Sequence, residues 1–282
     1  MVLTIRRLRF ADIDQVDQVL IATFQESSFK DELAFCLKLQ PDGWLVAQKD
    51  HSIIGMVGAV NYGSVAQVGL MAVHPAYQGQ GIGRTLLGSL LKKLDQQGCS
   101  SIRLEASAAG VSLYSKFGFE KYEATWVFTH FRCDLTLPIS HQVVPLRLHH
   151  LPALSAFDTP IFGDNRQILF NLLLREFSDR AFITYDQKGE IVGYLFAQSN
   201  LIGPWVATTS KAAERLLAAA LSLPFSTSPI VITPGDNPSV RQLLGFYGFR
   251  PPQFASHRHM IRGEVALNQR QNIYGLAHFS LG

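Results

Sequence analysis

The sequence predicts an α/β chain made of two similar halves. Along both halves, short runs rich in β-branched and aromatic residues alternate with longer runs whose apolar residues recur at helical spacing. Prolines and polar residues interrupt this alternation over residues 135–145, so the boundary between the halves is expected there. We expect one domain over residues 1–137 and a second over residues 138–282.

Three short stretches of the first half recur in the same order in the second half. SIIGMVGAV resembles EIVGYLFAQ, VGLMAV resembles IGPWVA, and LYSKFGF resembles LLGFYGF. The glycines that they share keep similar offsets, and the pairs are Gly55 and Gly193, Gly69 and Gly203, and Gly118 and Gly248. Each match is weak alone, but three in register indicate an internal duplication.

The elements of the first half follow from these patterns. Alternating or continuous apolar runs predict strands over residues 2–9, 43–50, 52–63, 67–73, 99–107 and 120–135. Apolar residues at helical spacing predict helices over residues 12–24, 31–39, 84–94 and 110–119.

The same reasoning applies to the second half. It predicts a hairpin over residues 180–198 that turns at residues 187–190. It also predicts strands over residues 143–151, 201–208, 228–234 and 255–263. Helices are predicted over residues 165–177, 211–221 and 238–249.

The composition is that of a protein with a core and excludes several classes. Hydrophobic residues make up 47% of the 282 residues and charged residues 17%. The net charge of +3 comes without a concentrated basic stripe, which argues against a nucleic-acid partner. Cys36, Cys99 and Cys133 show neither metal-ligand spacing nor a disulfide framework, so we expect no metal site. Because a signal peptide and a membrane span are not evident, we expect a cytoplasmic protein without a membrane partner.

A cluster of glycines lies between a strand and an amphipathic helix, in HPAYQGQGIGRTLLGSLLKKL (residues 74–94). The first amides of a helix lack partners and carry partial positive charge, and glycines let them approach a phosphate closely. The spacing of Gly79, Gly81 and Gly83 fits neither a Walker loop nor the Rossmann fingerprint. These residues alone therefore indicate either a tight turn or an anion site.

The residues around these glycines resemble the acetyl-CoA loop of the GNAT superfamily of N-acetyltransferases. The family pattern, Gln/Arg-x-x-Gly-x-Gly/Ala, matches Gln78, Gly81 and Gly83. Downstream, LYSKFGFEKYE resembles the second signature of the family, with Tyr114 four residues before Gly118. The resemblance covers residues 3 to about 135. LEASAAGVSLYSKFGF and the IYGLAHFSLG segment are similar to a bacterial subgroup whose second half is a GNAT-like domain of uncertain role.

The resemblance implies tandem GNAT folds, each a mixed, mostly antiparallel twisted sheet flanked by helices. It implies acetyl-CoA as co-substrate and direct attack of a primary amine on the thioester in a ternary complex. It assigns Met71, Ala72 and Val73 to the pantetheine arm and acetyl group, and Tyr114 as the acid for the leaving sulfur. The loop residues that it assigns to the pyrophosphate are Gln78, Gly79, Gln80, Gly81, Ile82, Gly83 and Arg84.

The acceptor site and the general base are less well defined. In the family the acceptor lies between the first two helices and the strands beside the cofactor, where we expect Phe24, Phe29 and Tyr62. Many relatives carry a glutamate base on the central strand, but this strand offers only Gln67. Three other groups are candidates for the base, namely Glu26, His74 and Glu105. The residues favour none of them, and polyamines, amino acids, antibiotics, peptide N-termini and lysines all stay open as acceptors.

The second half lacks both signatures. Only TTS separates its strand from the following helix, and Leu244 replaces the tyrosine. Two roles are open for this half: it walls off the acceptor site of the first half, or it forms a homodimer interface. Within IFGDNRQIL, Asp164 and Gln167 have the spacing of a capping box, while Arg166 is a candidate ligand-binding residue. The alternative for the whole chain is a non-catalytic acyl-CoA-binding sensor.

Overall fold

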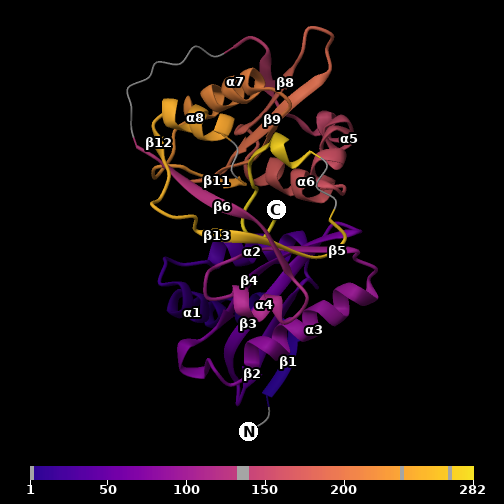
Figure 1. Cartoon of the computed structure of the whole chain (residues 1–282), viewed down its shortest axis with the longest axis vertical. Helices are drawn as coiled ribbons and strands as arrows, with labels where there is room; N and C mark the ends of the chain where they lie inside the picture. Colours follow the sequence, from indigo (N-terminus) through magenta and orange to yellow (C-terminus); the bar gives the residue numbers. More distant parts are fainter. Residues whose placement is uncertain (1–2, 132–139, 236–237, 266–268) are drawn as a thin grey trace.

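The computed structural model describes residues 3–131, 140–235, 238–265 and 269–282 (Figure 1). The helices of the first half are α1 (Ile13–Phe24), α2 (Lys30–Leu39), α3 (Ile82–Gln96) and α4 (Val111–Ser115). Its strands are β1 (Leu3–Arg7), β2 (Trp44–Lys49), β3 (Ser52–Asn61), β4 (Val65–Val73), β5 (Ser101–Ala106) and β6 (Glu120–His130). The alternation of strands and helices that the sequence predicts is confirmed in this half.

The second half repeats this order. Its helices are α5 (Leu151–Phe162), α6 (Gln167–Glu176), α7 (Ser210–Leu221) and α8 (Pro238–Phe246). Its strands are β7 (Val143–Pro145), β8 (Ala181–Tyr185), β9 (Ile191–Ala197), β10 (Ile202–Ala207), β11 (Ile230–Pro234), β12 (Phe249–Arg250), β13 (His257–Gly263) and β14 (Ile273–Gly275).

The structure differs from the sequence prediction around the start of the second half. The strand predicted over residues 143–151 ends at Pro145 and is followed by α5, which was not predicted. Pro152 and Pro160 argue against a helix in the sequence, but Pro152 lies in the first turn, where its missing N–H costs no hydrogen bond. Cys133 and the boundary expected at residues 137 and 138 lie outside the described residues.

The two halves exchange strands. The larger sheet has the order β1-β2-β3-β4-β5-β13-β6-β11, with β12 also beside β6, and the smaller sheet has the order β14-β10-β9-β8-β7. Strand β13 of the second half lies between β5 and β6 of the first, so Arg258 pairs with Ala106 on one side and Ala124 on the other. Strand β6 in turn pairs with β11, where Phe128 is opposite Val231. Of the strand pairs with a described register, only β4 with β5 is parallel.

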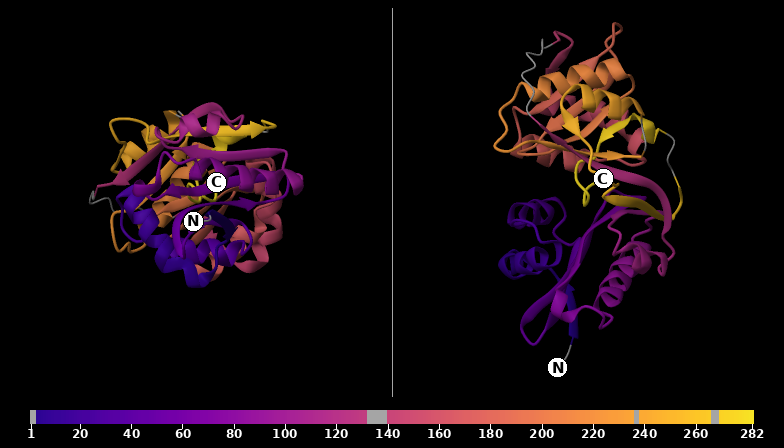
Figure 2. Two further views of the ribbon diagram at one scale, coloured as in Figure 1. Left: turned by 90° about the horizontal axis from the view of Figure 1, so that it is seen from below. Right: turned by 60° about the vertical axis from the view of Figure 1, so that its left-hand side comes forward.

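Helices cover both faces of the larger sheet (Figure 2). On one face, α3 and α4 bury an apolar cluster that includes Leu86, Leu90 and Tyr114. On the other face, α1 and α2 share a single apolar cluster with α5 and α6 of the second half. That cluster joins residues such as Leu33 and Phe170, so the second half completes the core on the α1 and α2 face.

Matching glycines support the internal duplication. A Cβ atom on Gly55 would lie 2.9 Å from the carbonyl oxygen of Ala72 and 3.1 Å from Leu86 Cδ1. A Cβ atom on Gly193 would lie 2.8 Å from the carbonyl oxygen of Val206 and 3.0 Å from Leu216 Cδ1. In both halves the third strand therefore needs a glycine where the following strand and helix approach most closely.

None of the described helices combines the length and the apolar character needed to cross a membrane. The described residues also contain no group of three His, Cys, Asp or Glu side chains placed to hold a metal ion. Cys36 and Cys99 are buried free thiols, and burial raises the pKa of each. These two residues are therefore neutral packing groups.

Candidate active site

Strand β4 bulges at its centre. Two of its residues, Leu70 and Met71, are opposite the single residue Val57 of β3, and Leu70 has a left-handed φ of 51°. The parallel pairing of β4 with β5 ends at Val68 and Leu104, although both strands continue. Beyond that pair, no described strand pairs with the edge of β4 that faces β5.

Val73 presents a backbone amide at this unpaired edge. The N–H of His74 donates to the carbonyl oxygen of Ile54 on β3 at 2.9 Å. Because successive residues of an antiparallel strand face opposite edges, the N–H of Val73 points to the β5 edge. Its carbonyl oxygen accepts hydrogen bonds from Gln78 Nε2 at 2.9 Å and Thr23 Oγ1 at 3.2 Å. Two side chains therefore hold Val73 in place.

The glycines of the loop after β4 have two different roles. Gly79 and Gly81 have left-handed φ values of 75° and 80°, and a Cβ atom on either would meet no atom within 4 Å. The backbone conformation, rather than lack of space, requires glycine at these two positions. A Cβ atom on Gly83 would lie 3.1 Å from Met71 Cε, so this glycine allows α3 to approach the bulge closely.

The amides of this loop are available to a ligand. No described residue accepts a hydrogen bond from the backbone N–H groups of residues 79–84, and the first bond of α3 runs from Thr85 to Gly81. The first turn of α3 has neither a capping side chain nor an acidic residue, and Arg84 is exposed beside it. Free amides, the helix dipole and a nearby cation are the features by which a helix N-terminus binds an anion, and binding of an anion at this turn stays a prediction.

Three of the predicted cofactor residues, Met71, Val73 and Ile82, lie on the same face as the predicted acid. Ile82 and Tyr114 belong to the apolar cluster against which Met71 and Val73 pack. Ala72 points to the opposite face and joins the cluster of α1 and α2. The side chain of Gln80 is exposed, with its Nε2 atom 3.5 Å from the carbonyl oxygen of Ala76.

Tyr114 has a buried ring and an unpaired hydroxyl. The ring centroid lies 5.9 Å from that of Phe119, and a Cβ atom on Gly110 would lie 2.7 Å from the ring. No described residue forms a hydrogen bond with the hydroxyl, and its oxygen is not among the buried unpaired polar atoms. Burial raises the pKa of the phenol above its ordinary value of 10, so the group stays protonated at physiological pH.

The three predicted acceptor residues are in two different surroundings. Phe24 and Phe29, at the end of α1 and the start of α2, have ring centroids 5.7 Å apart, and Phe24 is 39% exposed. Tyr62 is buried between the halves, where its ring meets Phe162 edge-on and its hydroxyl donates to the carbonyl oxygen of Leu281 at 2.7 Å. The hydroxyl of Tyr62 is therefore already used, and a role for this residue in acceptor binding stays a prediction.

Glu105, one of the candidates for the base, is enclosed in a polar network. Its carboxylate lies 2.6 Å from Nδ1 of His259 and 3.6 Å from Arg270, and it accepts a hydrogen bond from Thr125. Burial opposes its ionisation, but these neighbours outweigh burial and lower its pKa. Because only 1% of either the Glu105 or the His259 side chain is exposed, a substrate amine cannot reach this pair.

The other candidates for the base differ in access. His74 uses its Nδ1 atom to accept the amide of Ala76, which fixes the start of the loop. Glu26 is exposed between α1 and α2. Gln67, at the position where many relatives carry glutamate, is buried, and its amide donates to the carbonyl oxygen of Phe279 at 3.0 Å.

Sequence reasoning missed the contribution of residues 276–282, which we call the 276–282 segment. The segment lies between the halves and contacts β4 through Gln67 and the residue that follows β3, Tyr62. The similarity of this segment to the bacterial subgroup is visible in the sequence, but the sequence alone indicates no role for any of its residues.

The described part of the second half has no comparable turn of free amides. Strand β10 ends at Ala207, and α7 begins three residues later with Thr209 as its N-cap. Thr209 Oγ1 accepts a hydrogen bond from the backbone N–H of Ala212 at 3.1 Å, so a side chain caps the N-terminus of α7. The N-terminus of α3 has no such cap. Leu244, at the position of the missing tyrosine, is fully buried.

Thr209→Ala is expected to lower the free energy of unfolding by about 1 kcal/mol, because it removes the N-cap of α7. The measurement is denaturant unfolding of the full chain. A free energy of unfolding equal to that of the wild-type protein would contradict the assignment of Thr209 as the N-cap.

The segment that contains Arg166 is structural. The guanidinium of Arg166 is fully buried and makes two hydrogen bonds of 2.9 Å to Asp158, and it also donates to Tyr194 and Gly282. The capping box predicted for Asp164 and Gln167 is wrong, because the side chain of the intervening Asn165 accepts the amide of Gln167. The carboxylate of Asp164 instead accepts hydrogen bonds from the backbone N–H groups of Ser64 and Val65, where the chain turns from β3 into β4.

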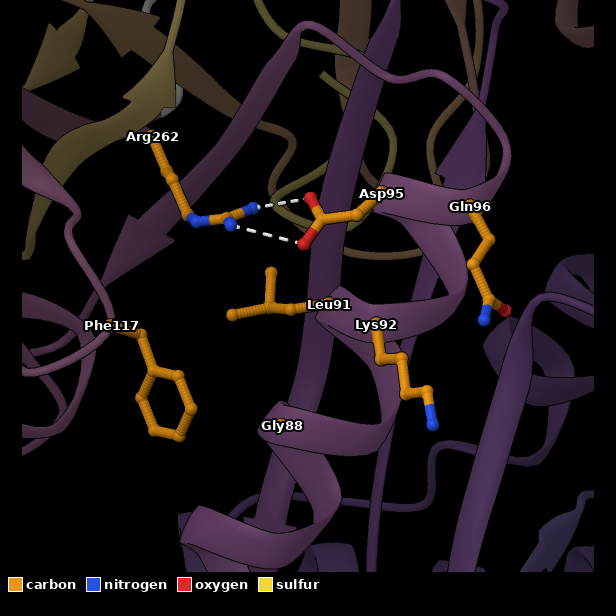
Figure 3. Close-up of a pocket in the computed structure, with 7 residues that line it drawn as sticks. All are labelled: Gly88, Leu91, Lys92, Asp95, Gln96, Phe117 and Arg262. Atoms are coloured by element: carbon orange, nitrogen blue, oxygen red, sulfur yellow. Dashed lines mark hydrogen bonds and ion pairs between the residues drawn. The ribbon is translucent and has the colours of Figure 1, made fainter.

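A surface hollow of about 500 Å³ lies along the outer side of α3 (Figure 3). Leu91 and Phe117 form its apolar wall, and Asp95 and Arg262 are joined across it by hydrogen bonds of 2.7 and 3.0 Å. Arg262 comes from β13, so this ion pair also ties the second half to α3. The hollow contains none of the predicted site residues, and we assign it no role in catalysis.

Comparisons with known proteins cover both halves. A model of the acetyltransferase (GNAT) family matches residues 9–119, and a model of an acetyltransferase (GNAT) domain matches residues 154–275. The uncharacterized N-acetyltransferase YitH of Bacillus subtilis is 28% identical over 170 residues, which are 58% of this chain and 59% of that protein. A putative ribosomal protein bS18-alanine N-acetyltransferase of the same organism is 29% identical over 120 residues, 41% of this chain and 80% of that protein. This chain thus covers less than two thirds of the length of YitH.

Solved structures match over nearly the whole chain. A putative acetyltransferase from Pyrococcus horikoshii has a TM-score of 0.86 at 26% identity, over 99% of this chain and 96% of that one. A GCN5-related N-acetyltransferase from Sphaerobacter thermophilus has a TM-score of 0.67 at 12% identity, over 92% of this chain and 94% of that one. The second match shows the fold alone.

Proposed function

Because the chain belongs to the GNAT family, we propose that its first half transfers an acetyl group from acetyl-CoA to a primary amine. We assign acetyl-CoA binding and acetyl transfer to residues 1–137, completed by β13, while residues 138–282 complete the core and supply the 276–282 segment beside β4. The observation that carries this proposal is the open edge of β4 next to a turn of free amides. Among the described residues, the corresponding strand β10 is paired on both edges and the following helix is capped.

The residues divide the work of the reaction. The pyrophosphate of coenzyme A binds the amides of residues 79–84, and the pantetheine arm lies along the unpaired edge of β4. The amine attacks the thioester carbon, and the amide of Val73 stabilises the negative charge that develops on the carbonyl oxygen. The C–S bond then breaks, and the hydroxyl of Tyr114 gives its proton to the leaving sulfur. Holding both reactants together supplies much of the acceleration.

Gly81→Ala is expected to weaken coenzyme A binding about tenfold or more. A side chain in the left-handed conformation costs roughly 1–2 kcal/mol, so the backbone of the turn is expected to change conformation. Its N–H groups then no longer point at the pyrophosphate, and the affinity falls. Isothermal titration of the full chain with coenzyme A measures this loss.

Gly189→Ala is the matched control. Gly189 lies in the turn between β8 and β9 with a φ of 82°, and a Cβ atom there would also meet nothing within 4 Å. The two variants should lose similar stability, but only Gly81→Ala should lose affinity. Equal coenzyme A affinities in the two variants would contradict the assignment of the loop.

Catalysis itself is tested by release of free thiol from acetyl-CoA with a panel of amines. The panel includes a polyamine, free amino acids, lysine, an aminoglycoside and a peptide that begins with alanine, the last because one relative is named for that acceptor. Tight binding of acetyl-CoA without release of thiol for any amine would favour the acyl-CoA sensor over the enzyme.

A further inference from the structure

The 276–282 segment lies directly against the bulge of β4. A Cβ atom on Gly69, the residue before the bulge, would lie 2.3 Å from Cβ of Ser280, so only glycine allows this contact. The carbonyl oxygens of Phe279 and Leu281 accept hydrogen bonds from the first half, and that of Gly282 accepts one from the Arg166 guanidinium. The segment also folds back on itself, because the amide of Gly282 donates to the carbonyl oxygen of His278 at 3.1 Å. The segment is therefore held in place against β4, on the face of the sheet that α1 and α2 cover.

The segment carries an imidazole that is held by a carboxylate. Nδ1 of His278 lies 2.8 Å from Oε1 of Glu32 on α2, and Ser280 Oγ donates to the same carboxylate oxygen at 2.8 Å. The side chain of His278 is 31% exposed and that of Glu32 is 18% exposed. Nε2 of His278 has no hydrogen-bond partner among the described residues and is not a buried unpaired atom. One ring nitrogen is thus fixed while the other is free to meet a substrate.

The end of α1 and the residues after it lie near both Val73 and this imidazole. Thr23, near the end of α1, donates to the carbonyl oxygen of Val73. Glu26, three residues later, lies close enough for its negative charge to raise the pKa of His278. The pair of Glu105 and His259 has the same chemistry but is closed off from any substrate. Of these two dyads, only that of His278 and Glu32 is accessible.

We propose that His278, supplied by the second half and positioned by Glu32, is the general base that takes the proton from the acceptor amine. This proposal rests on the acetyltransferase function proposed above. The lone pair of His278 Nε2 takes a proton from the substrate ammonium, and the electrons of that N–H bond stay on the substrate nitrogen. That nitrogen attacks the thioester carbon, the C–S bond breaks, and the sulfur takes the proton of Tyr114. The products are the acetylated amine and coenzyme A, and solvent restores both side chains.

The charges around His278 fit this role. Burial opposes protonation of the ring, but Glu32 and the more distant Glu26 outweigh it and raise its pKa above the ordinary 6.5. The other titratable group at Glu32 is the buried thiol of Cys36, whose raised pKa keeps it neutral. The two carboxylates also attract a cationic amine to the imidazole. A base must be neutral, so activity is expected to rise as the pH passes upward through the raised pKa.

The test compares pH profiles of kcat/KM for the full chain, with acetyl-CoA and an amine that the thiol-release panel identifies. His278→Gln is expected to lower kcat/KM on the order of 100-fold at neutral pH, with partial recovery at high pH, where the amine arrives neutral. Glu32→Gln is expected to move the acidic limb to lower pH, because it removes the main group that raises the pKa. Affinity for coenzyme A should stay within about twofold in both variants. His149→Gln, at an exposed imidazole of the second half, is the control and should match the unchanged protein.

The possible failures are distinguishable. If the wild-type protein acetylates an amine and His278→Gln has the same kcat/KM and the same pH profile, the role of His278 is wrong and the acetyltransferase function stands. An acidic limb that stays in place in Glu32→Gln also overturns the role of His278, and this variant decides the matter if His278→Gln does not fold. An unchanged protein that binds acetyl-CoA but acetylates no amine overturns the enzyme function and the base together.

Discussion

Tyr114→Phe is expected to lower kcat for acetyl transfer on the order of 100-fold at neutral pH while leaving coenzyme A affinity unchanged. The ring of phenylalanine keeps the packing against Phe119 and Gly110, so the change removes only the hydroxyl. Without it the thiolate must leave unprotonated, and a positioned acid typically contributes a factor of 10² to 10⁴. Because burial raises the pKa of Tyr114, the loss should persist across the range in which the enzyme is stable. Thiol release at saturating substrates measures kcat.

Tyr247→Phe provides the control for this measurement. Tyr247 is a buried phenol of the second half, and its hydroxyl donates to Glu214 Oε1 at 3.0 Å, away from the open edge of β4. Its loss should change stability slightly and kcat not at all. If Tyr114→Phe turned over as fast as Tyr247→Phe at every pH, Tyr114 would not be the acid.

Arg166→Met is expected to lower the free energy of unfolding by about 3–5 kcal/mol. The variant leaves the carboxylate of Asp158, which is 0% exposed, without the cation that now makes two hydrogen bonds to it. An uncompensated buried charge costs this much because the protein interior cannot replace its hydration. Denaturant unfolding followed by circular dichroism measures the effect.

The double variant Asp158→Leu with Arg166→Met separates charge from packing. It removes both charges, so it should be more stable than Arg166→Met alone, as for other buried ion pairs replaced by apolar residues. If the double variant were less stable than the single one, the hydrogen bond that Asp158 accepts from the Tyr194 hydroxyl at 2.6 Å would outweigh the cost of the uncompensated charge.

The features that the sequence predicted well are local ones. A strand, a glycine-rich turn and a helix N-terminus are encoded within about 20 consecutive residues around Gly81, and the alternation of strands and helices is equally local. The duplicated glycines at 55 and 193 could also be found, because the same close approach of strand and helix selects glycine in both halves. These signals depend on short-range geometry, which a single sequence contains.

The features that were missed depend on distant partners. The alternation in HRHMIRG shows which side chains share a face of β13, but it does not show that Ala106 and Ala124 are the neighbours of Arg258. The proposed base is a similar case. His278 lies in the IYGLAHFSLG segment that the sequence singles out, but its partner Glu32 is far away in the sequence and in no motif. Helix α5 was missed for a different reason. Proline usually interrupts a helix, and the sequence does not show that Pro152 lies in the first turn, where proline is tolerated.

The position of β13 also has a consequence for synthesis of the chain. Glu105 of β5 and its partner His259 are 154 residues apart, so the ribosome completes the first half long before the strand that belongs beside β5 exists. At roughly 5–20 residues per second, translation leaves that edge bare for on the order of ten seconds. A bare strand edge is a template for wrong pairing, so the nascent chain needs protection, for example by a chaperone, during this interval.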